Sequence, residues 1–213
     1  MRNRTFTIAS PRNKLVTLDI IPGHFTTSTS HLTHYLDMSR LKFDAMIARN
    51  VAHELAAPYL SSSLVDTIIC MEETEVIGAY LAEELLKSGT MVVNSGRQIH
   101  VLTPTNNTQG QFIFPKNTED WVFNKHVVLL AATVASGKTV NQALECIRYY
   151  NGLLVGVSAL FESGAKVAGQ EINTIFSGDA IPGYHVYKPE ECALCQEGQK
   201  LDAIVNHSGY FQL

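Results

Sequence analysis

The chain has 213 residues, of which 46% are hydrophobic and 17% are charged, and its formal net charge at pH 7 is −4. The apolar content is enough to fill one sizeable core, so a single domain over residues 1–213 is expected. The acidic balance excludes the basic field typical of nucleic-acid-binding domains. No apolar run reaches 18 residues, so a membrane is not an expected partner. Four cysteines do not suggest a disulfide framework in a chain of this length, which favours a reducing cytoplasm.

The order of the predicted elements indicates the fold class. Short apolar runs bounded by turn residues alternate with segments whose apolar side chains recur at helical spacing. Such alternation is typical of an α/β fold with a mostly parallel central sheet flanked by helices. The predicted elements are strands at 5–9 and 15–21, a helix at 40–57, a strand at 65–70, a helix at 77–86, strands at 91–93 and 127–130, a helix from residue 140, and a strand at 153–161.

The most informative stretch runs from the strand at 127–130 through a turn of small residues into a helix. At such a junction the unpaired N–H groups of the first helical turn and the positive end of the helix dipole converge, which suits a phosphate. A nucleotide-binding P-loop would need a glycine five residues before Gly137, and Ala132 stands there. The predicted phosphate-binding residues are Ala135, Ser136, Gly137, Lys138 and Thr139.

This stretch resembles the signature of type I phosphoribosyltransferases, in which a hydrophobic strand, two acidic residues and a Ser/Thr-Gly loop hold the 5′-phosphate of phosphoribosyl pyrophosphate. The segment after residue 21 is similar to the hood of orotate phosphoribosyltransferases. The matching hood residues are Gly23, Phe25, Ser28, Tyr35 and Asp37. The resemblance implies a phosphoribosyltransferase-type fold with a small hood from the N-terminal segment (about 1–40), a core at about 41–200, and a homodimer.

The chain departs from that family wherever the family places charge. Ala131 and Ala132 replace the acidic pair, and the hood lysine falls near Thr27. The segment 95–114, which we expect to be a mobile surface loop at 105–111, lacks the family's catalytic cations and keeps only Arg97 and His100 just upstream. The replaced cation positions are Val101, Leu102, Thr105 and Asn107, and Glu162-Ser163-Gly164 stands where the family has an Asp-Arg segment that reaches the base.

The loop that wraps pyrophosphate in the family is replaced by Met71-Glu72-Glu73-Thr74-Glu75. These carboxylates could hold Mg²⁺ against pyrophosphate. Alternatively, they stabilise the N-terminus of the following helix, and we favour this interpretation.

We therefore predict an orotate phosphoribosyltransferase-like protein that is catalytically degenerate and binds phosphate or a sugar 5-phosphate at 135–139. We assign it no catalytic residue and no metal ligand. The alternative is an active Mg²⁺-dependent phosphoribosyltransferase of nucleotide metabolism with a different acceptor base, so activity as an enzyme stays open.

One pattern near the C-terminus offers a metal as an alternative. Cys192 and Cys195 resemble a tail found in a subset of these transferases and could bind zinc with His185 and His207. One Cys-x-x-Cys supplies only two of four ligands, so a reduced turn without metal is the favoured interpretation.

Overall fold

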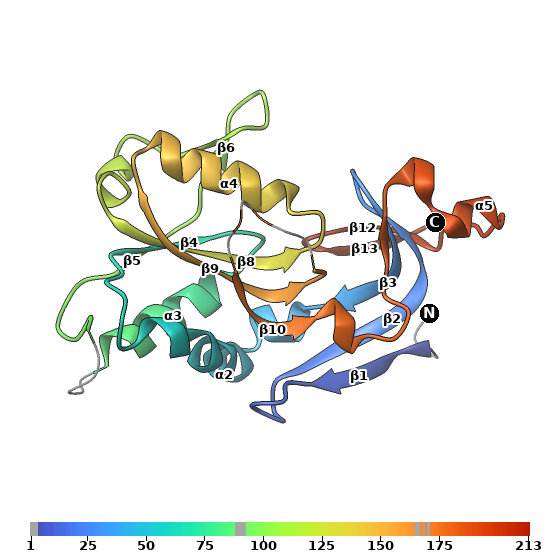
Figure 1. Cartoon of the computed structure of the whole chain (residues 1–213), viewed down its shortest axis with the longest axis horizontal. Coiled ribbons are helices and arrows are strands. Elements are labelled where there is room, and N and C mark those ends of the chain that lie inside the picture. The colour runs from blue at the N-terminus through green and yellow to red at the C-terminus, as the bar shows by residue number, and fades with distance from the viewer. Residues whose placement is uncertain (1–3, 88–92, 165–166, 168, 170) are drawn as a thin grey trace.

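The computed structural model describes residues 4–87, 93–164, 167, 169 and 171–213. Two sheets lie next to each other (Figure 1). On the left of that view is a parallel sheet between helices, and on the right is a mostly antiparallel sheet that contains the N-terminal strands and the C-terminal strands. We call the second one the hood sheet.

The parallel sheet has the order β10-β9-β8-β4-β5, and each neighbouring pair runs parallel. The predicted fold class is confirmed. The strands of the parallel sheet are β4 (Thr67–Cys70), β5 (His100–Leu102), β8 (His126–Val134), β9 (Leu153–Glu162) and β10 (Ile172–Ser177). The predicted strand 91–93 lies outside the described residues except for Val93.

Helices cover both faces of this sheet (Figure 1). The helices α2 (Ala45–Ala56) and α3 (Glu75–Leu86) pack on one face, and α4 (Lys138–Tyr149) packs on the other. Strand β8 can be apolar throughout because alternate residues enter the two cores: Leu130 meets the α2–α3 side and Leu129 the α4 side.

The helix predicted at 40–57 is interrupted by Asp44. A short α1 (Ser39–Phe43) precedes this residue, and α2 follows it. The Asp44 carboxylate accepts hydrogen bonds from the backbone N–H groups of Met46 and Ile47, at 3.0 and 3.2 Å, and so caps the first turn of α2. The helix is interrupted at Asp44 because its carboxylate accepts hydrogen bonds from the first N–H groups of a new helix.

The hood sheet draws on both ends of the chain. Its path is β11-β3-β2-β12-β13, and β1 pairs with β2. The prediction of a hood from the N-terminal segment was therefore incomplete, because β12 pairs with β2 through contacts 178 residues apart in sequence, Ala203 with Phe25. The strands are β1 (Phe6–Ala9), β2 (Thr17–Thr26), β3 (His31–Asp37), β11 (Val186–Tyr187), β12 (Ala203–Asn206) and β13 (Gly209–Gln212).

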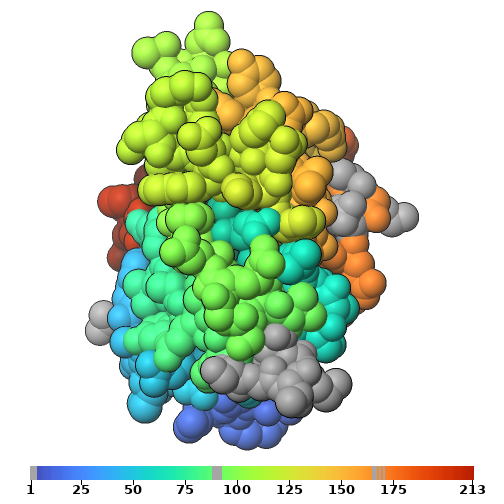
Figure 2. All heavy atoms as spheres, turned by 90° about the vertical axis from the view of Figure 1, so that its left-hand side faces the viewer, coloured from blue at the N-terminus to red at the C-terminus, as the bar shows by residue number. Residues whose placement is uncertain are grey.

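The remaining elements are short. The segment predicted as a mobile loop contains a hairpin of β6 (Thr105–Asn106) and β7 (Phe112–Ile113), which projects at the top of the molecule (Figures 1 and 2). Within the described ranges, no helix is both long and apolar enough to cross a membrane. The short helices are Ala57–Tyr59, Glu119–Trp121, Gly178–Ala180, Pro189–Glu191 and α5 (Ala193–Gln196).

Candidate functional site

A cavity of about 590 Å³ lies where the carboxyl end of the parallel sheet faces the hood sheet. The arrow of β8 and the N-terminal end of α4 both point toward the hood in Figure 1. The cavity is lined by the turn 135–139 after β8, by the β2–β3 turn of the hood and by the C-terminal segment 204–208. Single residues from α1 and from the end of β4, Lys42 and Glu72 among them, also reach it. Ligands of open α/β sheets bind outside the carboxyl ends of the strands, so this is the candidate site.

The turn predicted to hold phosphate lines this cavity with all five of its residues. Gly137 has φ 75° and is the N-cap of α4, without a side-chain cap. Glycine suits this left-handed position because other residues are strained there. The turn is held by the residue after β9, Ser163, whose hydroxyl donates to the Ala135 carbonyl at 2.6 Å. The first N–H groups of α4 have no partner within the helix and lie at the cavity.

The two alanines in place of the acidic pair face different ways. Ala132 is 3% exposed and lines the cavity, whereas Ala131 is fully buried against the α4 side of β8. The apolar side chains at both positions offer no oxygen to a sugar hydroxyl.

A carboxylate from a neighbouring strand end does reach this part of the cavity. Glu72 follows β4, has φ 58°, and accepts hydrogen bonds from the Thr133 backbone N–H at 2.9 Å and from the Thr133 hydroxyl at 3.3 Å. Burial raises the pKa of Glu72, against the opposing effect of the Thr133 hydrogen bonds. The preferred interpretation of the acidic segment 71–75 is therefore wrong for Glu72, which lies at the cavity, and holds for Glu75 in the first turn of α3.

The cavity also contains a lysine that the sequence did not single out. Lys42 is 3% exposed, and its Nζ lies 2.8 Å from the Glu73 carboxylate and 2.7 Å from the His207 carbonyl. The hydrogen bond from Lys42 holds the pKa of Glu73 below its usual range. Lys42 lies at the end of α1 and was expected on an amphipathic helix, where a lysine normally reaches solvent. Its partners come from residues 73 and 207, and no local pattern could indicate them.

The two cations upstream of the hairpin do not line the cavity. The Arg97 guanidinium lies 3.3 Å from the Asp66 carboxylate, and the His100 ring stacks on Trp121 with the centroids 4.6 Å apart. Arg97 precedes β5 and His100 begins it, at the amino end of the parallel sheet, whereas the turn 135–139 lies at the carboxyl end of β8. Val101 and Leu102 are part of β5 and pack in the two cores.

The hood residues shared with the family have structural contacts. The ring centroids of Phe25 and Tyr35 lie 6.1 Å apart within the hood core. A Cβ at Gly23 would lie 2.7 Å from an Asp202 carboxylate oxygen, so the close approach of the C-terminal segment requires glycine. Thr27, at the position of the family's lysine, lines the cavity, and its hydroxyl accepts a hydrogen bond from the Ser30 N–H at 2.9 Å.

The cysteines near the C-terminus do not meet the histidines expected beside them. Cys192 and Cys195 lie with His24 and His31, and this is the one such group among the described residues. His207 instead lines the cavity, and His185 lies beside Tyr187 with ring centroids 5.7 Å apart. The alternative that grouped the two cysteines with His185 and His207 is therefore wrong in its histidines, because β2 and β3 bring His24 and His31 to the cysteines instead.

No family model matches the chain. Comparison with known proteins finds similar sequences and similar solved structures. The orotate phosphoribosyltransferase of Chlorobium phaeobacteroides is 26% identical over 187 residues, which are 86% of this chain and 88% of that protein. The orotate phosphoribosyltransferase of Thermotoga maritima is 26% identical over 182 residues, 84% of this chain and 88% of that protein.

Solved structures support the fold. The UMP synthase of Leishmania donovani superposes with a TM-score of 0.55 at 20% identity, over 76% of this chain and 34% of that one. A phosphoribosyltransferase from Corynebacterium diphtheriae superposes with a TM-score of 0.52 at 17% identity, over 75% of this chain and 89% of that one. The chain has a phosphoribosyltransferase-type fold, and its sequence resembles orotate phosphoribosyltransferases over most of its length.

Proposed function

We propose that this orotate phosphoribosyltransferase-like chain binds a sugar 5-phosphate in the cavity and has lost phosphoribosyl transfer. The observation that carries the proposal is the turn 135–139, which combines a left-handed Gly137, an uncapped N-terminus of α4 and a position on the cavity wall. A phosphate on this turn would accept hydrogen bonds from the free N–H groups and meet the positive end of the helix dipole.

The size and lining of the cavity support a small phosphorylated ligand. Its volume of about 590 Å³ suits a sugar phosphate or nucleotide. The hydroxyls of Ser28 and Ser39 on its wall can donate to or accept from ribose hydroxyls. Lys138 and Thr139 begin α4 and supply a charge and a hydroxyl next to the predicted phosphate.

The same cavity is poorly equipped for transfer. In that reaction positive charge builds on the ribose while pyrophosphate leaves, and preorganised carboxylates and cations stabilise this charge separation. Ala132 offers no carboxylate, Arg97 and His100 lie at the other end of the sheet, and Lys42 is already paired with Glu73. Losing one electrostatic contact of this kind costs about 3–4 kcal/mol in the barrier.

Isothermal titration with ribose 5-phosphate, inorganic phosphate and phosphoribosyl pyrophosphate, each with and without Mg²⁺, tests the binding site. We expect ribose 5-phosphate to bind and Gly137→Val to weaken it at least tenfold. Gly110→Val is the matched control, because Gly110 also has a positive φ (77°) but lies at the exposed tip of the β6–β7 hairpin. Equal affinity in wild type and Gly137→Val would count decisively against the site.

A separate assay tests the loss of transfer. With orotate, phosphoribosyl pyrophosphate and Mg²⁺, we expect no detectable orotidine monophosphate from protein that binds ribose 5-phosphate. An active orotate phosphoribosyltransferase in the same buffer is the positive control. Turnover within a few hundredfold of that control would reject the degenerate site and leave the binding result intact.

We also propose that the chain forms a homodimer through the face formed by α1 and the start of α2. Phe43 and Met46 are 59% and 65% exposed there. Large apolar side chains gathered at one face favour association with a partner.

A further inference from the structure

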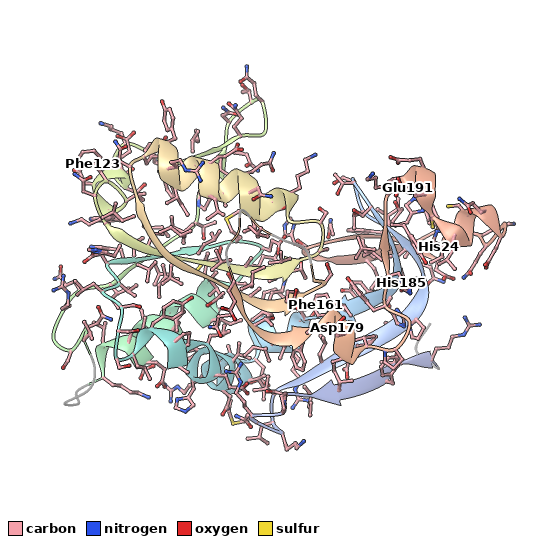
Figure 3. The ribbon with its side chains drawn as sticks, in the orientation of Figure 1. His24, Phe123, Phe161, Asp179, His185 and Glu191 are labelled. Carbon is pink, nitrogen blue, oxygen red and sulfur yellow. The ribbon has the colours of Figure 1, made fainter. Side chains whose placement is uncertain are left out.

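Four potential metal ligands converge at the hood sheet, and none of them belongs to the turn 135–139. They are the ring nitrogens of His24 and His31 and the sulfur atoms of Cys192 and Cys195, and all four atoms lie within 4.8 Å of one another. Figure 3 shows His24 on the hood side of the molecule, where the chain carrying Glu191 and α5 passes. Two ligands therefore come from β2 and β3 and two from the C-terminal segment.

Four of the six distances between the ligand atoms are close to those of a tetrahedral site. His24 Nε2 lies 3.2 Å from His31 Nδ1, 3.4 Å from Cys192 Sγ and 3.6 Å from Cys195 Sγ, and Cys195 Sγ lies 3.3 Å from His31 Nδ1. Zinc bonds of about 2.0–2.1 Å to nitrogen and about 2.3 Å to sulfur, at tetrahedral angles, separate neighbouring ligand atoms by about 3.3–3.8 Å. The observed spacing lies close to this range.

The orientation of His24 is set by a partner outside the group. Its Nδ1 lies 2.9 Å from the Gln199 carbonyl, which can only accept, so Nδ1 carries the proton. Nε2 then has a free lone pair directed at the other three atoms. A ligating histidine in a metal site usually donates its second ring N–H in this way.

Hydrogen bonds alone account poorly for the arrangement. The single lone pair of His24 Nε2 can accept one well-directed hydrogen bond, yet three polar atoms lie within 3.6 Å of it. His24 and Cys192 are 0% and 1% exposed, so solvent does not reach these two side chains. A cation at the common centre would satisfy all four groups at once.

We propose that His24, His31, Cys192 and Cys195 bind one Zn²⁺ in a structural Cys₂His₂ site. Two thiolates and two imidazoles in tetrahedral array select zinc among common metals, and four protein ligands leave no open position for catalysis. On binding, the two thiols release their protons to solvent and the sulfur atoms donate to the metal.

The site would fasten the C-terminal segment to the hood. This segment leaves the sheet at β11, whose Tyr187 pairs with His31, and returns at β12, whose Ala203 pairs with Phe25. The ligands His24 and His31 flank the β2–β3 turn, whose residues Thr26–Ser30 line the cavity. The metal would therefore hold one wall of the cavity in place without touching the ligand.

Metal analysis of the purified full chain is the first test. We expect one zinc per chain by elemental mass spectrometry after dialysis against metal-free buffer. Replacing zinc with Co²⁺ should give visible absorption of a tetrahedral ion together with a sulfur-to-cobalt charge-transfer band. A fully reduced, folded chain that takes up neither ion at micromolar concentration would overturn the proposal.

Variants test the ligand assignment. Cys195→Ser and His31→Asn change ligands that are exposed or half-buried, so the chain should still fold while its zinc affinity falls at least a hundredfold and its cobalt charge-transfer band changes. Cys146→Ala and His185→Asn are the matched controls, because neither residue is in the group, and both should keep one zinc. Full zinc affinity in Cys195→Ser would refute the assignment, as would a Cys192–Cys195 disulfide in metal-free protein isolated under reducing conditions.

A stability readout completes the test. Chelation with EDTA should lower the melting temperature of the wild type and of His185→Asn but leave that of Cys195→Ser unchanged, because only bound metal adds to stability. Equal shifts in all three proteins would contradict a metal held by these residues.

Discussion

At the scale of single residues, Lys42 and Glu72 are a base and an acid that line the same cavity but have different hydrogen-bond partners. Lys42 is compensated by the Glu73 carboxylate and by the carbonyl of His207. The Glu72 Oε2 accepts both hydrogen bonds from Thr133, and among the described residues no cation forms an ion pair with this carboxylate. Desolvation therefore dominates for Glu72 and favours its protonated form.

The raised pKa of Glu72 predicts a pH dependence of stability. Because the folded state holds this proton more tightly than the unfolded state, folding is favoured most below the ordinary pKa of 4.5 and loses stability as the pH rises from there through the raised value. Glu72→Gln lacks this loss. Urea unfolding of both proteins from pH 4.5 to 8 should show the wild type falling progressively below the variant. Parallel curves for the two proteins would contradict a raised pKa.

At the scale of elements, strand β8 separates two cores and leads into the turn 135–139. From Val127 to Ala132 its side chains pack alternately toward α4 and toward α2 and α3. Consecutive alanines at the strand end therefore have different surroundings. Ala131 contacts the α4 core, whereas Ala132 reaches the cavity.

This difference predicts unequal effects of restoring the acids one at a time. Ala131→Asp places a charge in an apolar core and should destabilise the fold by several kcal/mol. Ala132→Asp should cost less, because its carboxylate can be hydrated in the cavity. Urea denaturation of the two variants measures the difference. Equal losses would mean that both positions are desolvated alike, and we expect neither variant to form orotidine monophosphate.

At the scale of the whole molecule, the two ends of the chain complete one sheet. The complete hood sheet includes C-terminal strands, because β12 pairs with β2 and β11 pairs with β3. The cavity therefore depends on the C-terminal segment, which supplies residues 204–208 of its wall. The face formed by α1 and the start of α2 is left with exposed apolar side chains.

The exposed α1–α2 face predicts a dimer in solution. Sedimentation at micromolar concentration should give about twice the 23.5 kDa of the single chain. Phe43→Glu with Met46→Glu should shift the protein to the single-chain mass, because two charges would have to be desolvated in the interface. Tyr149→Glu is the control, since Tyr149 is 80% exposed on α4, away from that face. A clean monomer of the wild type would remove the dimer.

Local sequence patterns were sufficient to predict much of the fold. The apolar runs of β4, β8 and β9 and the helical spacing in α2 and α4 were sufficient to predict an α/β protein with a mostly parallel sheet, because burial on both faces requires continuous apolar strands. The turn 135–139 was predictable for the same reason, since its small residues, its glycine and the following helix are neighbours in sequence.

Other features depend on residues that are remote in sequence, and no local pattern contains them. The cavity position of Lys42 requires Glu73 and His207, and the group of His24, His31, Cys192 and Cys195 requires β12 to pair with β2. The sequence by itself determined the fold class and the position of the turn 135–139 between a strand and a helix, because periodicity and turn chemistry are short-range. Only the tertiary structure decided which charges and which ligands meet, because hydrogen bonding between distant strands sets those distances.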